Sequence, residues 1–308
     1  PDAPPAGQQQ QPRPDGPVGP AEAQPGPPAL GRVSVHPVAL RRVDDGIWPF
    51  GPALHSVWPI MARIRLFIDH PLAPGQAVPL APAQAHYMSG VMRLGAGAEI
   101  AVFNGRDGEF AARIAQAGKR GGTLDVGQQT APQRDPPDLW LLFAPIKKAR
   151  TDFIVEKAAE LGVARILPVQ TDFTNSERIR QDRLQAHAIE AAEQCGGTFV
   201  PPVADLQPLA RLLDGWDGAR RILWADEAMA GPAEALAGLP QGSWAILIGP
   251  EGGFSEAERS RLAASPFVDR ISLGPRILRA DTAAVAAIAL WQAALGDWRA
   301  DRQKKNPA

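Results

Sequence analysis

Two short stretches in the C-terminal third of the chain combine glycine, proline and charged side chains in a way that suits ligand binding. They are IGPEGGFSEAE (residues 248–258) and LGPRILRADTAA (residues 273–284). In both, Gly-Pro directly follows an apolar run. Glycine permits a positive φ angle or the close approach of a ligand, and proline stiffens the backbone after it. Both stretches are therefore candidate site loops.

Helix capping explains some of the polar residues in the first stretch. Ser255 and Glu258 have the spacing of a capping box at the start of a helix. Capping gives no reason for Glu251, which stands between proline and Gly-Gly. Neither G-x-G-x-x-G nor G-x-x-x-x-G-K-[ST] is present, so the usual dinucleotide and P-loop phosphate sites lack their residues. Glu251 is thus a candidate functional acid.

The second stretch places two cations where a helix start disfavours them. Asp281 or Thr282 can cap the helix that follows. Arg276 and Arg279 come just before that helix, and the positive end of a helix dipole repels cations. Either these arginines form ion pairs with Glu251 or Asp281 and only shape the loop, or they face a ligand.

The elements that must position these loops alternate between strand and helix. Such alternation predicts a parallel α/β sheet with helices on both faces. In open sheets of this kind, ligands bind where the carboxyl ends of strands lead into helix N-termini, and the loop WADEAM (residues 224–229) is a third candidate there. Strands are expected at 139–145, 165–170, 221–226, 244–249 and 270–274, and helices at 147–162, 183–195, 255–264 and 282–295.

The sequence before this region has a different pattern. Residues 61–133 contain short strand-like runs with turn signals, one short helix near 81–94, and a hairpin at 100–114 whose loop holds Asn-Gly and Asp-Gly. This pattern predicts a small β-barrel. The proline-rich residues 131–138 are the expected linker.

The two ends of the chain have little to bury. Residues 1–60 are rich in proline and glutamine and predict a mobile extension, with Met61 as a candidate natural start. The alternative is a genuine disordered extension of the protein. Residues 299–308 are expected to form a polar tail.

Composition limits the classes of function. The 308 residues carry a net charge of -1, so no overall basic excess indicates free nucleic acid as a partner. The single Cys195 excludes a disulfide framework and fits a reducing cytoplasm. No apolar run approaches the roughly 20 residues of a membrane span, and no metal-ligand spacing is present. We expect a cytoplasmic protein with no metal site and no membrane contact.

The amino-acid sequences of the two candidate loops also resemble those of a known protein family. LIGPEGGFS (247–255) and LGPRILRADTA (273–283) are similar to signature segments of the RsmE family, the 16S ribosomal RNA uridine-N3 methyltransferases of the SPOUT superfamily. The resemblance continues in DFIVEKAAELGV (152–163), EAAEQCGG (190–197) and VMRLGAG (91–97), and covers nearly all of residues 61–298.

The resemblance implies a fold and partners that the patterns alone do not show. It implies a PUA-like RNA-binding β-barrel at 61–133 and a SPOUT-type parallel sheet at 138–298 whose last segment forms a trefoil knot. It also implies a homodimer and S-adenosylmethionine (SAM) as the methyl donor, with 16S rRNA in the assembled small subunit as the substrate. Asp281 stands where the commonest family pattern has glutamate, so a direct catalytic contact by this acid is in doubt.

The resemblance further assigns roles to residues in the loops. Arg279 and Arg276 would stabilise charge that develops on the uracil, and Asp281 or Glu251 would accept the N3 proton. The expected RNA contacts are Arg63, Arg65, Arg93, Lys147, Lys148 and Arg150. The expected SAM site, formed mostly by backbone groups, comprises Ala225, Asp226, Ile248, Gly249, Pro250, Glu251, Gly252, Gly253, Leu273, Gly274, Ile277, Leu278, Arg279 and Thr282.

Two other functions remain open from the sequence. One is a SPOUT enzyme that acts on transfer RNA, which the N-terminal barrel and the wording of the second loop disfavour. The other is a non-catalytic RNA-binding assembly factor, for which a broken cofactor loop would be expected. The glycines and both arginines of the two loops are present.

Overall fold

The computed structural model describes residues 64–118, 121–175, 179–226, 236 and 238–299. The extension expected at 1–60, the candidate start Met61 and the tail beyond Arg299 lie outside these residues, and so do residues 227–235 and 237, before the strand expected at 244–249. None of the helices in the described ranges is long and apolar enough to span a membrane.

The N-terminal part of the described chain is a five-stranded sheet. Its order is β1-β3-β4-β5-β2, with β1 parallel to β3 and the other pairs antiparallel. The expected hairpin is confirmed, because β3 and β4 pair antiparallel with Phe103 opposite Glu109. The strands are β1 (Arg65–Phe67), β2 (Ala77–Leu80), β3 (Glu99–Phe103), β4 (Glu109–Gly118) and β5 (Gly121–Ala131).

One short helical segment packs against this sheet, and the sequence predicts a short helix at this place. It consists of α1 (Pro82–His86) and a π-helical turn (Tyr87–Val91). Ala85 and Met88 of this segment are buried against apolar residues of the strands, including Ile100 and Leu124. A small sheet with one covered face can thus form its own core.

The C-terminal part is a six-stranded sheet in which every pair is parallel, as predicted. Its order is β11-β9-β10-β6-β7-β8. The strands are β6 (Leu139–Phe143), β7 (Arg165–Gln170), β8 (Gln207–Pro208), β9 (Arg221–Ala225), β10 (Trp244–Ile248) and β11 (Val268–Ile271). The two-residue β8 was not expected, because so short a strand leaves no periodic pattern.

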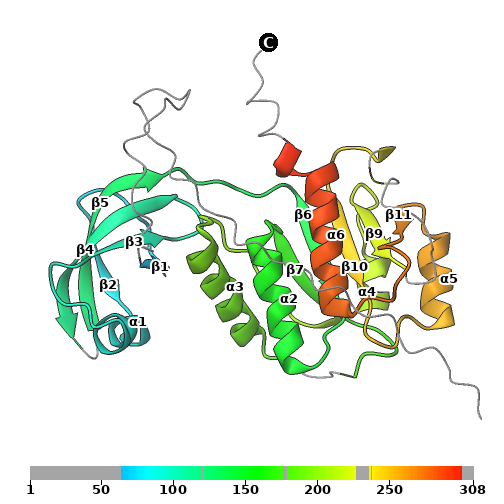
Figure 1. The fold of residues 1–308 in the computed structure, drawn as a ribbon, viewed down its shortest axis with the longest axis horizontal. Helices are drawn as coiled ribbons and strands as arrows, with labels where there is room; N and C mark the ends of the chain where they lie inside the picture. Colours follow the sequence, from blue (N-terminus) through cyan, green and yellow to red (C-terminus); the bar gives the residue numbers. More distant parts are fainter. Residues whose placement is uncertain (1–63, 119–120, 176–178, 227–235, 237, 300–308) are drawn as a thin grey trace, which may run out of the picture. The chain divides into compact units, whose positions relative to one another are not determined.

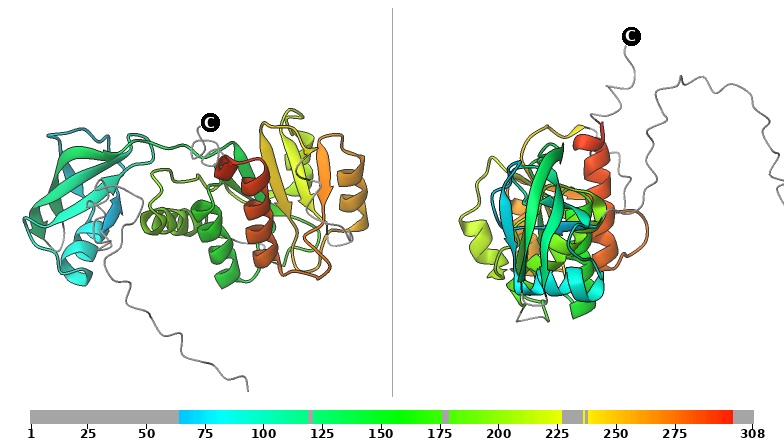
Figure 2. Two further views of the ribbon diagram at one scale, coloured as in Figure 1. Left: turned by 45° about the horizontal axis from the view of Figure 1, so that its top comes forward. Right: turned by 90° about the vertical axis from the view of Figure 1, so that its left-hand side faces the viewer.

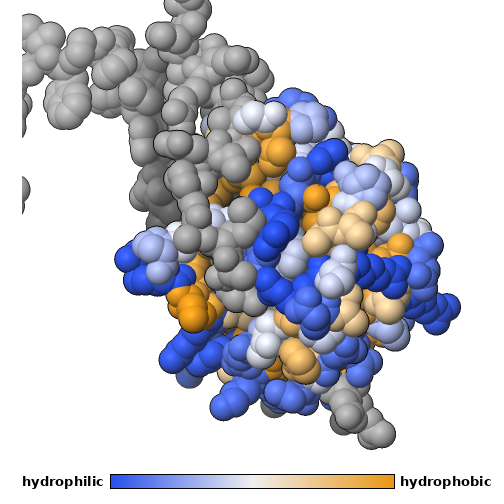
Figure 3. All heavy atoms as spheres, turned by 90° about the vertical axis from the view of Figure 1, so that its right-hand side faces the viewer, coloured by the Kyte–Doolittle hydropathy of each residue, from blue (hydrophilic) through white to orange (hydrophobic). Residues whose placement is uncertain are grey.

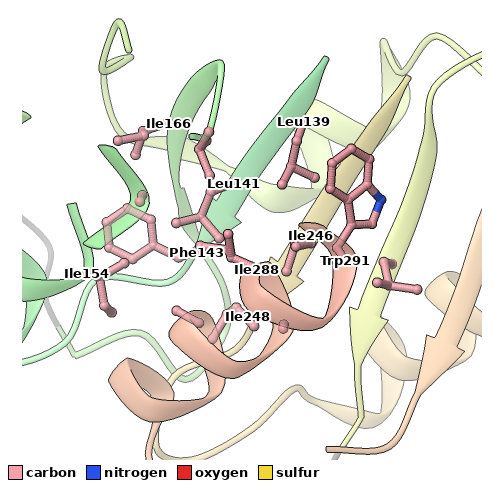
Figure 4. Close-up of a cluster of buried hydrophobic side chains, with 14 of the residues drawn as sticks. Leu139, Leu141, Phe143, Ile154, Ile166, Ile246, Ile248, Ile288 and Trp291 are labelled. Carbon is pink, nitrogen blue, oxygen red and sulfur yellow. The ribbon is translucent and has the colours of Figure 1, made fainter. Parts of the chain in front are cut away.

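Three helices cover one face of the six-stranded sheet. They are α2 (Lys148–Glu160), α3 (Gln181–Cys195) and α6 (Ala280–Ala294), which lie side by side with α2 in the middle (Figure 1, Figure 2). Strand residues that point to this face, such as Leu141 and Ile246, pack against Ile154 of α2 and Ile288 and Trp291 of α6 (Figure 4).

The opposite face has its own apolar layer. Leu142, Ala245 and Leu247, which alternate with the residues of the first face, pack with α4 (Leu209–Asp214) and α5 (Glu256–Ala264). The α5 helix buries Leu262, and the side of the molecule that carries it is largely hydrophilic with scattered apolar residues (Figure 3). Because both faces are covered, the strand residues form near-continuous apolar runs.

Candidate active site

A cavity of about 550 Å³ lies where three neighbouring strands end. Strands β9, β10 and β11 end at Ala225, Ile248 and Ile271, and the chain after each of them contributes to the wall. The lining residues are Ala225, Asp226, Ile248, Gly249, Pro250, Glu251, Gly252, Gly253, Leu273, Gly274, Pro275, Arg276, Ile277, Leu278, Arg279, Ala280 and Ala283. The structure thus brings together all the residues expected at the SAM site except Thr282.

The glycines of the first loop make room for their neighbours. A Cβ atom on Gly249 would lie 2.7 Å from the ring of Phe254, and one on Gly252 would lie 3.3 Å from the Cβ of Phe173. Gly253 adopts a φ of +70° and donates its N–H to the carbonyl of Pro250 at 2.9 Å. A larger residue at these positions would collide or strain the turn, so the loop depends on glycine.

Helix α5 begins with the predicted capping box. The Ser255 hydroxyl accepts from the N–H of Glu258 at 3.3 Å, and the Glu258 carboxylate accepts from the N–H of Ser255 at 2.9 Å. The same carboxylate accepts from the N–H of Asp172 at 3.0 Å. Glu258 and Ser255 therefore hold the first loop in place, which is the structural role expected of them.

The start of α6 differs from the sequence prediction. Arg279 is the N-cap residue and makes no side-chain cap, so the expectation that Asp281 or Thr282 caps this helix was wrong. Asp281 lies in the first turn, where a carboxylate is favoured by the helix dipole, and accepts from the N–H of Thr282 at 2.8 Å. The exposed Thr282 lies outside the cavity lining.

Arg276 and Arg279 lie on the cavity wall with their side chains exposed. Within the described ranges, neither guanidinium makes an ion pair or a hydrogen bond. The ion pairs with Glu251 or Asp281 that the sequence left open for them are absent from this part of the chain. Both cations are therefore available to an anionic ligand.

The cation that does pair with these acids is Arg150. Its Nη1 lies 3.4 Å from Glu251 Oε1, and its Nε lies 3.7 Å from Asp281 Oδ2. Arg150 was expected at the RNA interface, which stays a prediction; the structure shows that it lies beside the two candidate acids. One indication of this pairing was present in the sequence. A cation in the first turn of a helix is disfavoured by the helix dipole, so an acidic partner from another element could have been expected for Arg150.

Asp226 lines the cavity, but its carboxylate is held in the protein. The side chain is fully buried; Arg259 pairs with Oδ1 at 3.0 Å, and Arg270 pairs with Oδ2 through Nε at 2.8 Å. Both arginines also lie over the ring of Trp224. A buried carboxylate held between two arginines has a structural role, because each charge needs a partner once it is removed from water.

The residues expected at the RNA interface differ in how exposed their side chains are. Lys147, Lys148 and Arg93 are exposed, and Arg93 has a φ of +56°. Arg63 lies outside the described residues. Arg65 is mostly buried, pairs with Glu109 at 2.7 Å, and donates to backbone carbonyls near the end of α3, including that of Gly197 at 2.8 Å. Its guanidinium holds β1 to α3, so we leave it out of the interface.

Two family models match the chain. An RNA methyltransferase domain matches residues 133–292, and an RNA methyltransferase PUA domain matches residues 80–126. Among curated relatives, ribosomal RNA small subunit methyltransferase E of Rickettsia conorii is 32% identical over 73% of this chain and 93% of its own length. The protein of the same name from Bacillus subtilis is 28% identical over 67% of this chain and 85% of its own length.

Solved structures are similar to the same part of the chain. Ribosomal RNA small subunit methyltransferase E from Neisseria gonorrhoeae, bound to SAM, is 29% identical and superposes with a TM-score of 0.70 over 77% of this chain and 99% of that one. A methyltransferase structure from Legionella pneumophila with SAM bound is 30% identical, with a TM-score of 0.69 over 76% of this chain and 99% of that one.

Proposed function

The chain belongs to the RNA methyltransferase family that includes the ribosomal RNA small subunit methyltransferase E proteins, and we propose that it methylates N3 of a specific uridine in 16S rRNA with SAM as donor. The observation that carries this proposal is a glycine-walled cavity at the strand ends whose rim holds two arginines with no ion-pair partner in the described residues. SAM-bound relatives of the same fold support the identity of the donor.

The residues of the cavity fit SAM. Its volume of about 550 Å³ lies within the roughly 300–1,000 Å³ of small-molecule pockets. Gly249, Gly252 and Gly253 line one side of the cavity without side chains, and Ile248, Leu273 and Leu278 supply apolar walls. When bound, SAM supplies an electrophilic methyl group. The protein must then hold the two reactants in line.

Arg279 and Arg276 are the proposed stabilisers of the substrate's charge. The uracil N3 carries a weakly acidic proton and is a poor nucleophile until that proton is lost, because its lone pair is delocalised into the C2 and C4 carbonyls; loss of the proton frees the electron pair of the N–H bond for attack on the methyl group. Its removal places negative charge on O2 and O4 of the base. Fixed cations at the cavity rim lower the energy of this anion in the way that oxyanion-hole donors do. Arg279, the N-cap residue of α6, is the side chain on which we expect the reaction to depend most.

Asp281 and Glu251 are the proposed acceptors of the N3 proton. Both lie at the cavity rim or directly beside it, and both are within ion-pair distance of Arg150. Their shared cation holds the two carboxylates near the place where the base must enter. A carboxylate within hydrogen-bond reach of N3 satisfies the geometry of a general base.

The RNA contacts are proposed for the exposed cations near the start of α2 and in the PUA domain. Lys147 and Lys148 are exposed at the N-terminal end of α2, and Arg93 is exposed in the residues that the PUA model matches. Phosphate contacts from such side chains orient the RNA without reading its sequence. The base enters the cavity only if it leaves its stack, as in other enzymes that modify bases.

We further propose the assembly and the chain path that family membership suggests. These are a homodimer, a trefoil knot formed by residues 273–284 with α6, domains at 61–133 and 138–298, and a cytoplasmic location with the ribosome. The exposed Trp298 and Phe153 are apolar side chains that a second copy could cover. Light scattering of the purified protein tests the dimer, which a monomeric mass would exclude.

The test of the function is nucleoside mass spectrometry of 16S rRNA. Small subunits that lack the modification are incubated with SAM and residues 61–308, either wild type or Arg279→Ala. We expect 3-methyluridine with the wild-type protein and a loss on the order of 100-fold or more with the variant, as for removal of an oxyanion-hole donor.

The other outcomes separate the competing functions. No 3-methyluridine, together with normal SAM binding by calorimetry, would overturn the ribosomal assignment and favour transfer RNA, on which the same assay is then run. No SAM binding at all would favour a non-catalytic assembly factor. Lysine at position 279 is the matched variant, because it keeps the charge and removes the planar guanidinium.

A further inference from the structure

Arg150 is the cation that joins the two loops of the cavity. It projects from the first turn of α2 and lies between Glu251, in the loop after β10, and Asp281, in the first turn of α6. Its side chain is 31% exposed and that of Asp281 is 18% exposed, so the pair is partly shielded from water. Partial burial strengthens an ion pair relative to one on the open surface.

The two contacts use different atoms of the guanidinium group. Nη1 lies 3.4 Å from Glu251 Oε1 and Nε lies 3.7 Å from Asp281 Oδ2. Asp281 meanwhile uses its other oxygen, Oδ1, to accept from the N–H of Thr282. The planar, five-donor guanidinium can hold two carboxylates at once, whereas the single ammonium of lysine holds them less well.

The position of Arg150 differs from that of its neighbours on the same turn. Lys147 and Lys148 are exposed and, within the described ranges, make no ion pair. The first turn of α2 contains no acid that could offset the helix dipole. Arg150 therefore depends on carboxylates from outside its own helix, and both of these come from the walls of the cavity.

We propose that Arg150 is a positioning residue for methyl transfer, which rests on the proposed function. It holds the first turn of α6 through Asp281, and this turn follows directly after Arg279. It holds the loop at residues 248–253 through Glu251, and this loop lines the cavity proposed for SAM. One cation thus sets the spacing between the donor loop and the arginine that stabilises the substrate.

A positioning role for Arg150 affects the affinity for SAM and the rate of methyl transfer, and leaves the affinity for RNA unchanged. Removal of the side chain frees both loops, and small displacements of reacting groups can cost up to about 100-fold in rate. We expect Arg150→Ala to lower kcat by about 10- to 100-fold and to raise the Kd for SAM. Arg150→Lys should fall between this variant and the wild type.

The experiment measures three quantities for each variant. They are the Kd for SAM by calorimetry, kcat on small subunits, and the salt dependence of binding to small subunits. Lys148→Ala is the contrast on the same helix turn, and we expect it to reduce the salt slope and leave the Kd for SAM unchanged, because a lost phosphate contact releases fewer counterions. Arg261→Ala, which removes an arginine from the exposed ion pair with Asp214, is the control for loss of an ordinary surface pair.

A double-mutant cycle tests the route of the effect. The cycle treats Asp281→Asn with Glu251→Gln as one change and Arg150→Ala as the other. If Arg150 acts through the two acids, adding Arg150→Ala to the variant that lacks both acids changes its Kd for SAM little further. Additive effects, or a reduced salt slope with unchanged Kd for SAM, would overturn the proposal and return Arg150 to the RNA interface. If Arg150→Ala does not fold, Arg150→Lys carries the same comparison.

Different measurements test the role of Arg150 and the proposed methylation of uridine. Failure of the wild-type protein to form 3-methyluridine would contradict the proposed function. The coupling of Arg150 to Asp281 and Glu251 would still be measured by SAM affinity, which requires no methyl transfer. Unchanged SAM affinity in Arg150→Ala would contradict the positioning role whatever the RNA substrate.

Discussion

Single residues around the cavity separate into those that hold it and those that are free to act. Arg150 and Asp226 have their charges matched by neighbours within the protein. Arg276 and Arg279 have no such match within the described ranges. An arginine that has no carboxylate partner in the protein binds an anionic ligand more strongly than one that is already paired. We therefore assign the proposed chemistry to Arg276 and Arg279.

Gly249 is the residue at which a single added methyl group should disturb the cofactor loop. That methyl group would meet the buried ring of Phe254, which packs edge-on against Trp224. We expect Gly249→Ala to lower the free energy of unfolding by about 1–3 kcal/mol, as for overpacking of a core, and to weaken SAM binding. Chemical denaturation and calorimetry measure the two effects.

The control for this substitution is Gly238→Ala. Within the described residues, a Cβ atom added to Gly238 would meet no other atom within 4 Å, and the φ angle of this glycine is not positive. Its change should therefore leave the free energy of unfolding within about 0.5 kcal/mol of the wild type. If both substitutions change the free energy of unfolding equally, Phe254 can move away from the added methyl group at no energetic cost. A glycine would then not be required at position 249.

Pairs of elements are joined by a few buried polar contacts. Strand β1 meets the end of α3 through Arg65 and through Glu193, whose Oε1 accepts from the N–H of Phe67 at 2.9 Å. Burial raises the pKa of the Glu193 carboxyl, and nearby Glu190 raises it further, although the Phe67 N–H and Arg65 oppose the shift. The junction therefore favours the neutral form of Glu193.

This shift predicts a pH-dependent stability. A carboxyl with a higher pKa in the folded than in the unfolded chain stabilises the fold at low pH, and this contribution is lost as pH rises through the folded pKa. Glu193→Gln keeps an acceptor for Phe67 and cannot ionise. Thermal unfolding should show the variant to be more stable than the wild type at pH 8 and close to it near pH 4. The same difference at both pH values would count against this account.

At the scale of the whole molecule, charge predicts which form of the RNA is preferred. A net charge of -1 provides no long-range attraction to free RNA, so the exposed cations must act locally. We expect methylation of assembled small subunits to be faster than that of deproteinised 16S rRNA, measured as initial rates at equal RNA concentration. Equal rates would mean that the RNA alone presents the uridine.

The local elements and the loops between them could be predicted from the amino-acid order alone. The apolar runs at 139–143 and 244–248, the alternation of strand with helix, and the Gly-Pro pairs all act over a few residues. The structure has strands at both runs, a turn at 251–252 after the first Gly-Pro and a bend at 275–276 in the second. The capping box at Ser255 and Glu258 is also local. Such features follow from dihedral preferences and periodic burial, which the sequence carries directly.

Which charges meet could not be predicted in this way, because it depends on how the elements pack. Arg150 and Glu251 are 101 residues apart in sequence. No spacing rule links two side chains so far apart, so Arg150 was assigned to the RNA interface and its ion pairs with the acids were missed. The packing of α2 beside α6 placed Arg150 next to Asp281 and left Arg279 unpaired within the described chain. The reason is physical: a side chain's availability depends on the neighbours that folding brings to it.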